Sequence, residues 1–409
     1  MNILYIDHYA GSLRDGMEFR PYYFAREWQK MGHKVRVLGG DYSHVRTHQP
    51  EVPHDLCTEI IDGVEYQWIK AGTYEGNGTK RAISIFRFCR KLYSYAGKIA
   101  ADFKPDVVIT SSTYPLDCYA GRRIAKKAGG RYFHESHDLW PLTLIELGGM
   151  SKHHPFVMLL AKAEKFAYQK SEKVISLLPN ALEHMMEVGL QSPDKFVHIP
   201  NGIAIEDWES AIPMPDEHKE CFDKLHKEGK KIICYVGGIT KFDKIDFILE
   251  AADRERDNDN LAFVIVGKGV EKENFMAQAQ KMNLTNLTFL PPVPKKAVPS
   301  VLVEADILYI ALEYNSLYRY GISINKIYDY MMSGKPILFG GEAANLEVKD
   351  ADCGIIFNSN DIDSLIKAID DFMSMPEEEL RRLGSNGHSW VLENCEYRIL
   401  AERFIDALK

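Results

Sequence analysis

The stretch RYGISINKIYDYMMSGKPILFG, residues 319–340, contains a complete loop–helix–strand unit. Gly321 opens a turn, and Ser323 is the predicted N-cap of a helix whose apolar residues recur at helical spacing. Gly334 and Pro336 end that helix immediately before an apolar strand. Helices alternating with apolar strands are typical of α/β folds built on parallel sheets.

The same alternation runs through all 409 residues, which is more than one compact domain usually holds. Near-continuous Val, Ile and Leu strands indicate parallel sheets covered on both faces. We therefore expect two doubly wound, Rossmann-like α/β domains, residues 1–205 and 206–389, facing across a cleft where ligands bind. The expected strands are 2–7, 34–40, 106–112, 130–136, 173–178, 196–200, 231–239, 262–269, 287–292, 305–312, 335–341 and 353–358.

Composition narrows the class of protein. The net charge of −8 argues against nucleic acid as a partner. The N-terminus lacks the pattern of a signal peptide, and no stretch is long and apolar enough for a membrane span. The seven scattered cysteines form no C-x-x-C pair, which is typical of a reduced, cytoplasmic protein.

The start of the helix after Ser323 is suited to a phosphate group. Its first turn presents unpaired backbone N–H groups and the positive end of the helix dipole, and Lys326 adds a full charge. Asp329, one turn further on, suits the two hydroxyls of a ribose. The alternative is an ordinary Lys–Asp pair on a solvated helix face.

A second polar cluster, HESHD at residues 134–138, follows the expected strand 130–136. Side chains of adjacent strand residues point to opposite faces, so His134, Glu135, His137 and Asp138 cannot all converge on a metal ion easily. An acid–base role for one or two of them is favoured. A hydrogen-bonded loop network without catalytic function is the alternative.

The segment YGISINKIYDYMMSGKPI resembles the donor-binding segment of retaining GT-B glycosyltransferases of family 4, in the form found in a subgroup that builds bacterial capsule and O-antigen chains. Further stretches agree with the family in order and spacing. They are GMEFRPYYFAREWQKMGHKVRVL, ESHDLWP, IPNGI, YVGGITKFDKIDFILEAA, the segment from FVIVGKGVEK to VEADI, and HSWVLENCEYRILAERFIDAL.

The resemblance implies an N-terminal acceptor domain, a C-terminal donor domain, and a final helix at about 390–409 that packs back on the first domain. It implies transfer of a sugar, including N-acetylated amino sugars, from a UDP-sugar to a lipid-linked or glycan acceptor, without a metal or another cofactor. The alternatives are a nucleotide-sugar epimerase of the same fold and a non-catalytic nucleotide-sugar binding protein. An NAD-dependent dehydrogenase is disfavoured, because the dinucleotide fingerprint is absent.

The resemblance also implies site residues. His137, Asp138 and Lys326 would lie at the reacting groups. The donor-binding residues would be Gly238, Lys241, Gly267, Lys268, Val293, Arg319, Tyr320, Gly321, Ile322, Ser323, Lys326 and Asp329. The acceptor-binding residues would be Gly16, Glu18, Arg20 and Tyr114.

Several positions depart from the family pattern. Its two glutamates, eight residues apart, fall on Gly321 and Asp329, so the first is lost. A frequent arginine and lysine of the phosphate loop fall on Gly238 and Asp243, so the diphosphate is expected to be neutralised differently, with Lys326, Arg319 and Lys241 as the candidates. The D-x-D triads at residues 257–259, 350–352 and 361–363 are interpreted as solvated surface, not as metal ligands.

Residues 79–104 carry seven basic residues against one acid, with apolar residues at roughly helical spacing. A basic amphipathic helix can lie on an anionic membrane surface. The alternative is a helix packed on the core with a solvated basic face. Because the resemblance implies lipid-linked acceptors, the inner face of the membrane is an expected partner.

Overall fold

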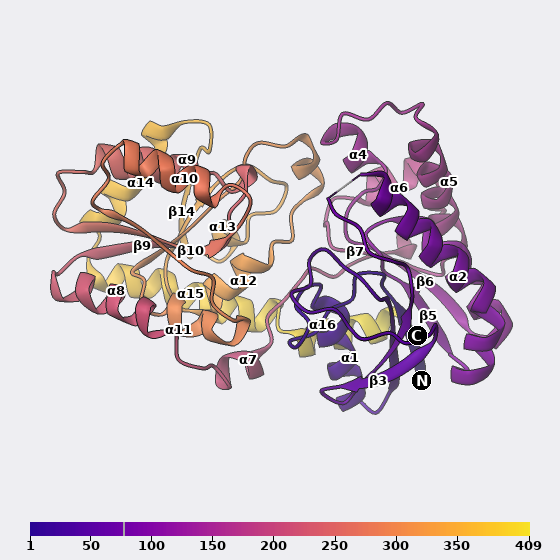
Figure 1. The fold of residues 1–409 in the computed structure, drawn as a ribbon. Helices are drawn as coiled ribbons and strands as arrows, with labels where there is room; N and C mark the ends of the chain where they lie inside the picture. Colours follow the sequence, from indigo (N-terminus) through magenta and orange to yellow (C-terminus); the bar gives the residue numbers. More distant parts are fainter. Residues whose placement is uncertain (77) are drawn as a thin grey trace. The chain divides into compact units, whose positions relative to one another are not determined.

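The computed structural model describes residues 1–76 and 78–409, and the chain forms two compact α/β units (Figure 1). Unit 1 comprises Met1–Asn201, Tyr320–Ser323 and Tyr397–Lys409, and unit 2 comprises Gly202–Arg319 and Ile324–Glu396. Each unit contains one sheet whose strands are mainly parallel. The predicted class, two Rossmann-like α/β domains, is confirmed.

The sheet of unit 1 has the strand order β3-β4-β2-β1-β5-β6-β7-β8. Only the β3–β4 pair is antiparallel among the paired strands of this sheet that the structure describes. These two strands were not expected, because exposed polar residues interrupt β3 and its apolar run is short. The strands are β1 (Asn2–Ile6), β2 (Lys34–Gly40), β3 (Cys57–Ile61), β4 (Val64–Ile69), β5 (Val107–Thr110), β6 (Arg131–Ser136), β7 (Val174–Ser176) and β8 (Phe196–His198).

Helices cover both faces of this sheet (Figure 1). One face carries α1 (Arg20–Lys30) and α16 (Tyr397–Ala407). The two helices pack on each other through aromatic rings, and the ring centre of Phe404 lies 5.2 Å from that of Phe24 and 5.0 Å from that of Trp28. The remaining helices of unit 1 are α2 (Thr79–Phe103), α3 (Cys118–Ala128), α4 (Leu142–Glu146), α5 (Pro155–Lys170) and α6 (Leu182–Val188).

The sheet of unit 2 has the order β11-β10-β9-β12-β13-β14, and its pairs are parallel. All six strands lie where the sequence predicts them: β9 (Lys231–Gly238), β10 (Leu261–Lys268), β11 (Leu287–Leu290), β12 (Ile307–Ala311), β13 (Ile337–Gly340) and β14 (Gly354–Phe357). The helices are α7 (Ile205–Glu209), α8 (Asp216–Lys227), α9 (Ile245–Arg254), α10 (Lys272–Lys281), α11 (Val298–Leu302), α12 (Asn325–Met332), α13 (Glu347–Asp350), α14 (Ile362–Ser374) and α15 (Glu377–Asn394).

The stretch at about 390–409 packs back on the first domain as predicted, through α16 and α1, but it is not a single helix. It consists of the end of α15 in unit 2 and the whole of α16 in unit 1. The break falls at Cys395, whose φ of −130° is not helical and whose carbonyl accepts a hydrogen bond from the Ile203 amide (2.8 Å).

The helix predicted after Ser323, α12, starts one residue later than expected. Ile324 is the N-cap residue, and Ser323 does not cap the helix, since its hydroxyl accepts a hydrogen bond from the Asn201 amide (2.8 Å). The helix ends at Ser333 and Gly334 as predicted, with Gly334 at a φ of 68°. None of the helices described combines the length and apolarity needed to cross a membrane.

Candidate functional site

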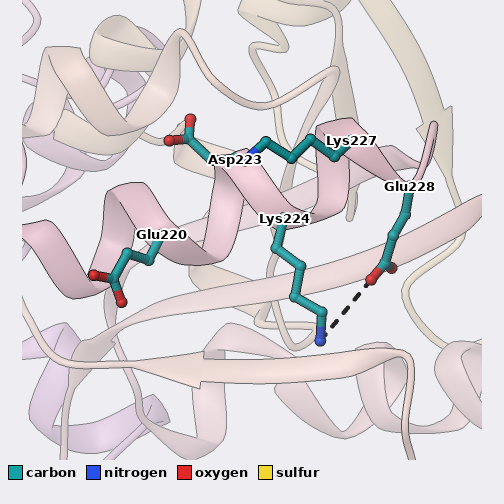
Figure 2. A pocket seen from close by; sticks show the side chains of 5 residues that line it. All are labelled: Glu220, Asp223, Lys224, Lys227 and Glu228. Atoms are coloured by element: carbon teal, nitrogen blue, oxygen red, sulfur yellow. Dashed lines mark ion pairs between the residues drawn. The ribbon is translucent and has the colours of Figure 1, made fainter.

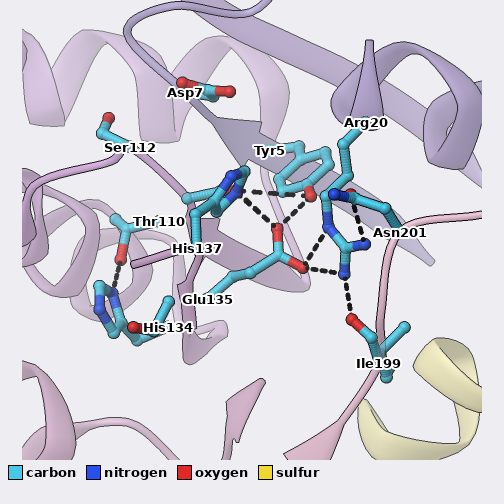
Figure 3. Close-up of polar contacts among 12 residues, drawn as sticks. Tyr5, Asp7, Arg20, Thr110, Ser112, His134, Glu135, His137, Ile199 and Asn201 are labelled. Carbon is cyan, nitrogen blue, oxygen red and sulfur yellow. Dashed lines mark hydrogen bonds and ion pairs between the residues drawn. The ribbon is translucent and has the colours of Figure 1, made fainter. Parts of the chain in front are cut away.

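The centre of the candidate site in unit 1 is Glu135, a fully buried carboxylate near the carboxyl end of β6 (Figure 3). Its Oε1 accepts hydrogen bonds from Arg20 Nη2 (2.7 Å) and Nε (3.0 Å). Its Oε2 accepts from Ser111 Oγ (2.6 Å) and from the Tyr5 hydroxyl. Burial alone would raise the pKa of Glu135, but the charges of Arg20 and His137 lower it, so Glu135 is ionised at neutral pH.

His137 follows this strand and is tied to the same carboxylate. Its Nε2 lies 2.7 Å from Ser111 Oγ and 3.5 Å from Glu135 Oε2. Because Ser111 donates its single proton to Glu135, His137 Nε2 donates to Ser111. Burial lowers the pKa of His137, but the adjacent negative charge of Glu135 raises it to about 9. His137 is therefore an imidazolium at neutral pH, and Nε2 is the ring nitrogen that contacts Ser111 and Glu135.

The other members of the HESHD cluster do not join His137. His134 lies on the opposite side of the strand, where its Nδ1 is 3.0 Å from Thr110 Oγ1, and burial lowers its pKa to about 4 (Figure 3). Asp138 is exposed. In the part of the chain that the structure describes, no three His, Cys, Asp or Glu side chains are grouped to hold a metal ion.

Two of the expected acceptor-binding residues are placed differently from the expectation. Arg20 is fully buried and directed at Glu135 and the backbone of residues 199–200, and therefore cannot touch an acceptor directly. Tyr114 is also fully buried, and its hydroxyl lies 2.6 Å from His8 Nδ1. Both departures have the same physical cause, since each side chain points into the interior of the sheet–helix layers.

Gly16 and Glu18 lie in a tight loop between β1 and α1. Ser12 and Gly16 exchange backbone hydrogen bonds (2.8 and 3.0 Å), and the Gly11 amide donates to the Glu18 carbonyl (2.7 Å). Gly16 has a φ of 103°, and a Cβ there would lie 2.9 Å from the Thr47 nitrogen, so glycine is required. The charge of Glu18 contributes to the raised pKa of His137.

Asp7, which the sequence did not single out, follows the last residue of β1. It is 2% exposed, its Oδ1 accepts from the Tyr9 amide (2.9 Å), and its Oδ2 has no partner among the described residues. Burial raises its pKa to about 7, against which the charge of His137 acts. Its place at the carboxyl end of a central parallel strand is the sequence signal that points to it.

In unit 2, Lys326 on the first turn of α12 lies against the carboxyl end of β9. Its Nζ donates to the Tyr235 hydroxyl (2.7 Å) and to Asp243 Oδ1 (2.5 Å). Its stem packs on Gly237, where a Cβ would lie 2.6 Å from Lys326 Cδ. The N-cap residue Ile324 makes no side-chain hydrogen bond to the first-turn N–H groups of α12. A cation and a helix N-terminus are thus brought together.

Asp329 does not pair with Lys326 as on a plain helix face. Both of its oxygens accept from Lys295 Nζ, at 2.7 and 2.5 Å, and Asp329 is 8% exposed. Lys295 was not expected from the sequence. The sequence feature that could have pointed to Lys295 is its position directly after Pro-Val-Pro, which follows the carboxyl end of β11.

The other expected donor residues are divided between the two units. Gly267 belongs to unit 2, where a Cβ would lie 1.9 Å from the Gly237 carbonyl oxygen, so it allows close approach of the two strand ends. Gly238, Lys241, Lys268 and Arg319 are exposed, and Val293 is half-buried. Tyr320, Gly321, Ile322 and Ser323 belong to unit 1, where the Asn180 amide donates to the Tyr320 carbonyl (2.9 Å).

Two surface features lack the marks of a ligand site. The aspartates of the three D-x-D triads are all exposed, as expected, and Asp352 and Asp363 pair with arginines. A depression of about 360 Å³ along α8 is lined only by charged side chains, among which Lys224 and Glu228 form a loose pair of 3.9 Å (Figure 2). It is a solvated helix face.

Comparison of the chain with known proteins identifies its family. Residues 216–390 match the family described as glycosyl transferases group 1, and residues 15–202 match the glycosyl transferase 4-like domain. The chain is 23% identical over 334 residues to the probable glycosyltransferase WbjE of Pseudomonas aeruginosa, covering 80% of this chain and 78% of that protein. It is 28% identical to the putative colanic acid biosynthesis glycosyl transferase WcaI of Escherichia coli K12, covering 50% of each chain.

Among solved structures, Alr3699/HepE of Anabaena in complex with UDP-glucose is similar in fold, with a TM-score of 0.68 and 11% identity over 100% of this chain and 99% of that one. Since the two family matches together span both α/β units, the chain belongs to the GT-B glycosyltransferases of the group 1 and 4-like families.

Proposed function

We propose that this glycosyltransferase retains the anomeric configuration. In the proposal it moves a sugar from a UDP-sugar to a lipid-linked or glycan acceptor during synthesis of a surface polysaccharide. Support for the donor class is the fold shared with a protein solved with UDP-glucose. Support for the pathway is the relative named for colanic acid biosynthesis. N-acetylated amino sugars are the donor sugars to test first.

The observation that carries the proposal is Lys326 beside the N-terminus of α12. Glycosyl transfer passes through an oxocarbenium-like state in which the nucleoside diphosphate leaves with its negative charge. A fixed ammonium and aligned N–H groups stabilise that charge as it develops, and they do not reorganise during the reaction. In this proposal no metal is needed, because Lys326 and the helix supply the positive potential.

Asp329 is proposed to bind the ribose hydroxyls of the nucleotide. A carboxylate offers about four lone-pair sites, so Asp329 can accept two hydroxyls while Lys295 holds it in place.

His137 and Asp138 are proposed to position the acceptor and the transferred sugar. Because His137 carries its proton at neutral pH, it serves as a hydrogen-bond donor through Nδ1 and not as a general base. Glu18 and Gly16, in the loop before α1, are proposed to contact the acceptor.

The test is a calorimetric and product assay with UDP, GDP, ADP, CMP and NAD, followed by the matching UDP-sugars with and without a metal chelator. The proposal expects UDP binding, and transfer to a saccharide acceptor that survives chelation. Interconversion of free UDP-sugars without an acceptor would identify an epimerase. UDP-sugar binding with neither transfer nor hydrolysis would identify a binding protein, and preference for NAD would reject all three.

A membrane surface is proposed as the second partner, through α2. Ile83 is 54% and Phe86 43% exposed, and exposed basic residues such as Lys80 and Arg90 flank them. Each basic residue near an anionic membrane contributes about 1 kcal/mol. The protein should therefore sediment with anionic vesicles but not with neutral ones, and the Ile83→Ser/Phe86→Ser variant should lose this binding. Equal sedimentation of variant and wild type would contradict the proposal.

A further inference from the structure

Arg20 uses its whole guanidinium group inside unit 1. Besides the two hydrogen bonds to Glu135, it donates to the Ile199 carbonyl (2.9 Å), the Pro200 carbonyl (2.6 Å) and Asn201 Oδ1 (3.3 Å) (Figure 3). It is fully buried, and its guanidinium carbon lies 4.7 Å from the centre of the Phe24 ring. One side chain thus contacts both the carboxylate of the candidate site and a segment far along the chain.

That segment ends where the chain leaves unit 1. Asn201 is the last residue of unit 1 before Gly202 begins unit 2. Its amide donates to Ser323 Oγ (2.8 Å) and its Nδ2 to the Ser323 carbonyl (3.0 Å). Ser323 is itself the last residue of unit 1 before the chain returns to unit 2 at Ile324. We call residues 199–201 and 320–323, where the chain passes from unit 1 to unit 2, the crossing segments. Asn201 and Ser323 join these two segments by hydrogen bonds.

The charge balance at Arg20 depends on one carboxylate. Glu135 is the carboxylate that contacts it, while the carbonyl groups and the Asn201 amide are neutral acceptors. Burial lowers the pKa of Arg20, whereas Glu135 and, to a smaller extent, Tyr5 and Tyr397 raise it. Burial lowers the pKa of His198 to about 4, and the charge of Arg20 adds to this. Tyr397 is the first residue of unit 1 after the last crossing. A buried guanidinium that loses its carboxylate retains only neutral acceptors, which hold it less firmly.

We propose that Arg20 is a positioning residue that joins the Glu135–His137 pair to the crossing segments, so that removal of the charge on Glu135 loosens residues 199–201 and 320–323. The link lies entirely within unit 1 and needs no assumption about the arrangement of the two units. It bears on the proposed function because residues 320–323, which the family resemblance implies in donor binding, belong to one of these segments.

The test is amide hydrogen exchange on the full-length protein without nucleotide or acceptor. Exchange at residues 199–203 and 320–323 is expected to become about tenfold faster or more in Arg20→Met and in Glu135→Gln. The matched control is Arg36→Met. Arg36 is also a buried arginine of unit 1, paired with Glu65 (2.7 Å) and Asp102 (2.6 Å) and lying 4.6 Å from the Phe103 ring. It should leave exchange at both segments unchanged.

Arg20→Lys separates the two functions of the side chain. A lysine keeps the charge beside Glu135 but cannot reach all the carbonyls, so the His137 pKa measured by NMR should stay high while the segments exchange faster. The proposal is overturned if folded Arg20→Lys and Glu135→Gln both exchange as the wild type does, or if Arg36→Met has the same effect. Because no substrate is present, absence of glycosyl transfer would reject the proposed function without affecting this result.

Discussion

Lys326 Nζ lies 2.5 Å from Asp243 Oδ1, so the ammonium that we assign to the donor diphosphate is paired with an internal carboxylate. The side chains are 23% and 15% exposed, respectively, which makes the pair accessible to a ligand. Asp243 stands where the resembling family often has a lysine. At this site the cation is Lys326 on α12, and the anion is Asp243, which follows the carboxyl end of β9.

This arrangement predicts that Asp243 competes with the diphosphate for Lys326. Asp243→Asn should strengthen UDP binding by roughly three- to tenfold, since a neutral amide attracts the ammonium less than a carboxylate does. Isothermal titration calorimetry with UDP measures the change. Thr240→Val is the control, because it removes the Thr240–Asp243 side-chain bond (2.6 Å) and leaves the charge in place. Weaker binding in Asp243→Asn but not in Thr240→Val would show that Asp243 orients Lys326 instead of competing.

The raised pKa of His137 predicts a stability difference that depends on pH. Its folded value of about 9 lies above the ordinary 6.5, so the stabilisation is full below pH 6.5 and is lost as the pH rises through 9. The wild type should exceed His137→Gln by up to about 3 kcal/mol at pH 6, given about 1.4 kcal/mol per pKa unit, and by nothing at pH 10.

His134→Gln serves as its control, because burial lowers the pKa of His134 to about 4. The histidine costs stability below pH 6.5, so the variant should gain on the wild type as the pH falls. Denaturant unfolding across this pH range measures both variants. The same pH trend in the two variants would contradict the assigned network.

The burial of the Asp7 carboxyl group predicts that replacing Asp7 by asparagine stabilises the protein. Burial raises its pKa from 3.8 to about 7, so its ionisation costs stability increasingly between pH 4 and 7 and by a constant amount above. Asp7→Asn should match the wild type at pH 4 and exceed it by about 2–4 kcal/mol at pH 8. Thermal unfolding at the two pH values decides the point, and a variant less stable at pH 8 would show that the charge of Asp7 is needed, for example by His137.

The strands of unit 2 were predictable because each is a short, continuous apolar run between helical patterns, as in Ile232–Val236. The β3–β4 hairpin escaped prediction because alternation of polar and apolar residues over so few positions is a weak signal. The prediction that Ser323 caps α12 is wrong for another reason. The Ser323 hydroxyl accepts a tertiary hydrogen bond from the Asn201 amide, which the local sequence does not show.

The candidate site was predictable in its charged residues but not in their partners. Lys326 was selected from its helix position, and His137 from the HESHD cluster through the family resemblance. Their partners Asp243 and Ser111 lie 83 and 26 residues away along the chain, and only folding brings them within hydrogen-bond distance. For the same reason Arg20 was predicted to bind the acceptor, although it is buried and paired with the distant carboxylate of Glu135.

The central claim is that Lys326 holds the diphosphate of a UDP-sugar, and titration of UDP into Lys326→Ala tests it most directly. Lys231→Ala is the control, since Lys231 is a half-buried, ion-paired lysine at the opposite end of β9. The account predicts UDP binding and turnover reduced about tenfold or more in Lys326→Ala, with Lys231→Ala unchanged and both variants folded. UDP affinity equal to that of the wild type in folded Lys326→Ala would contradict it.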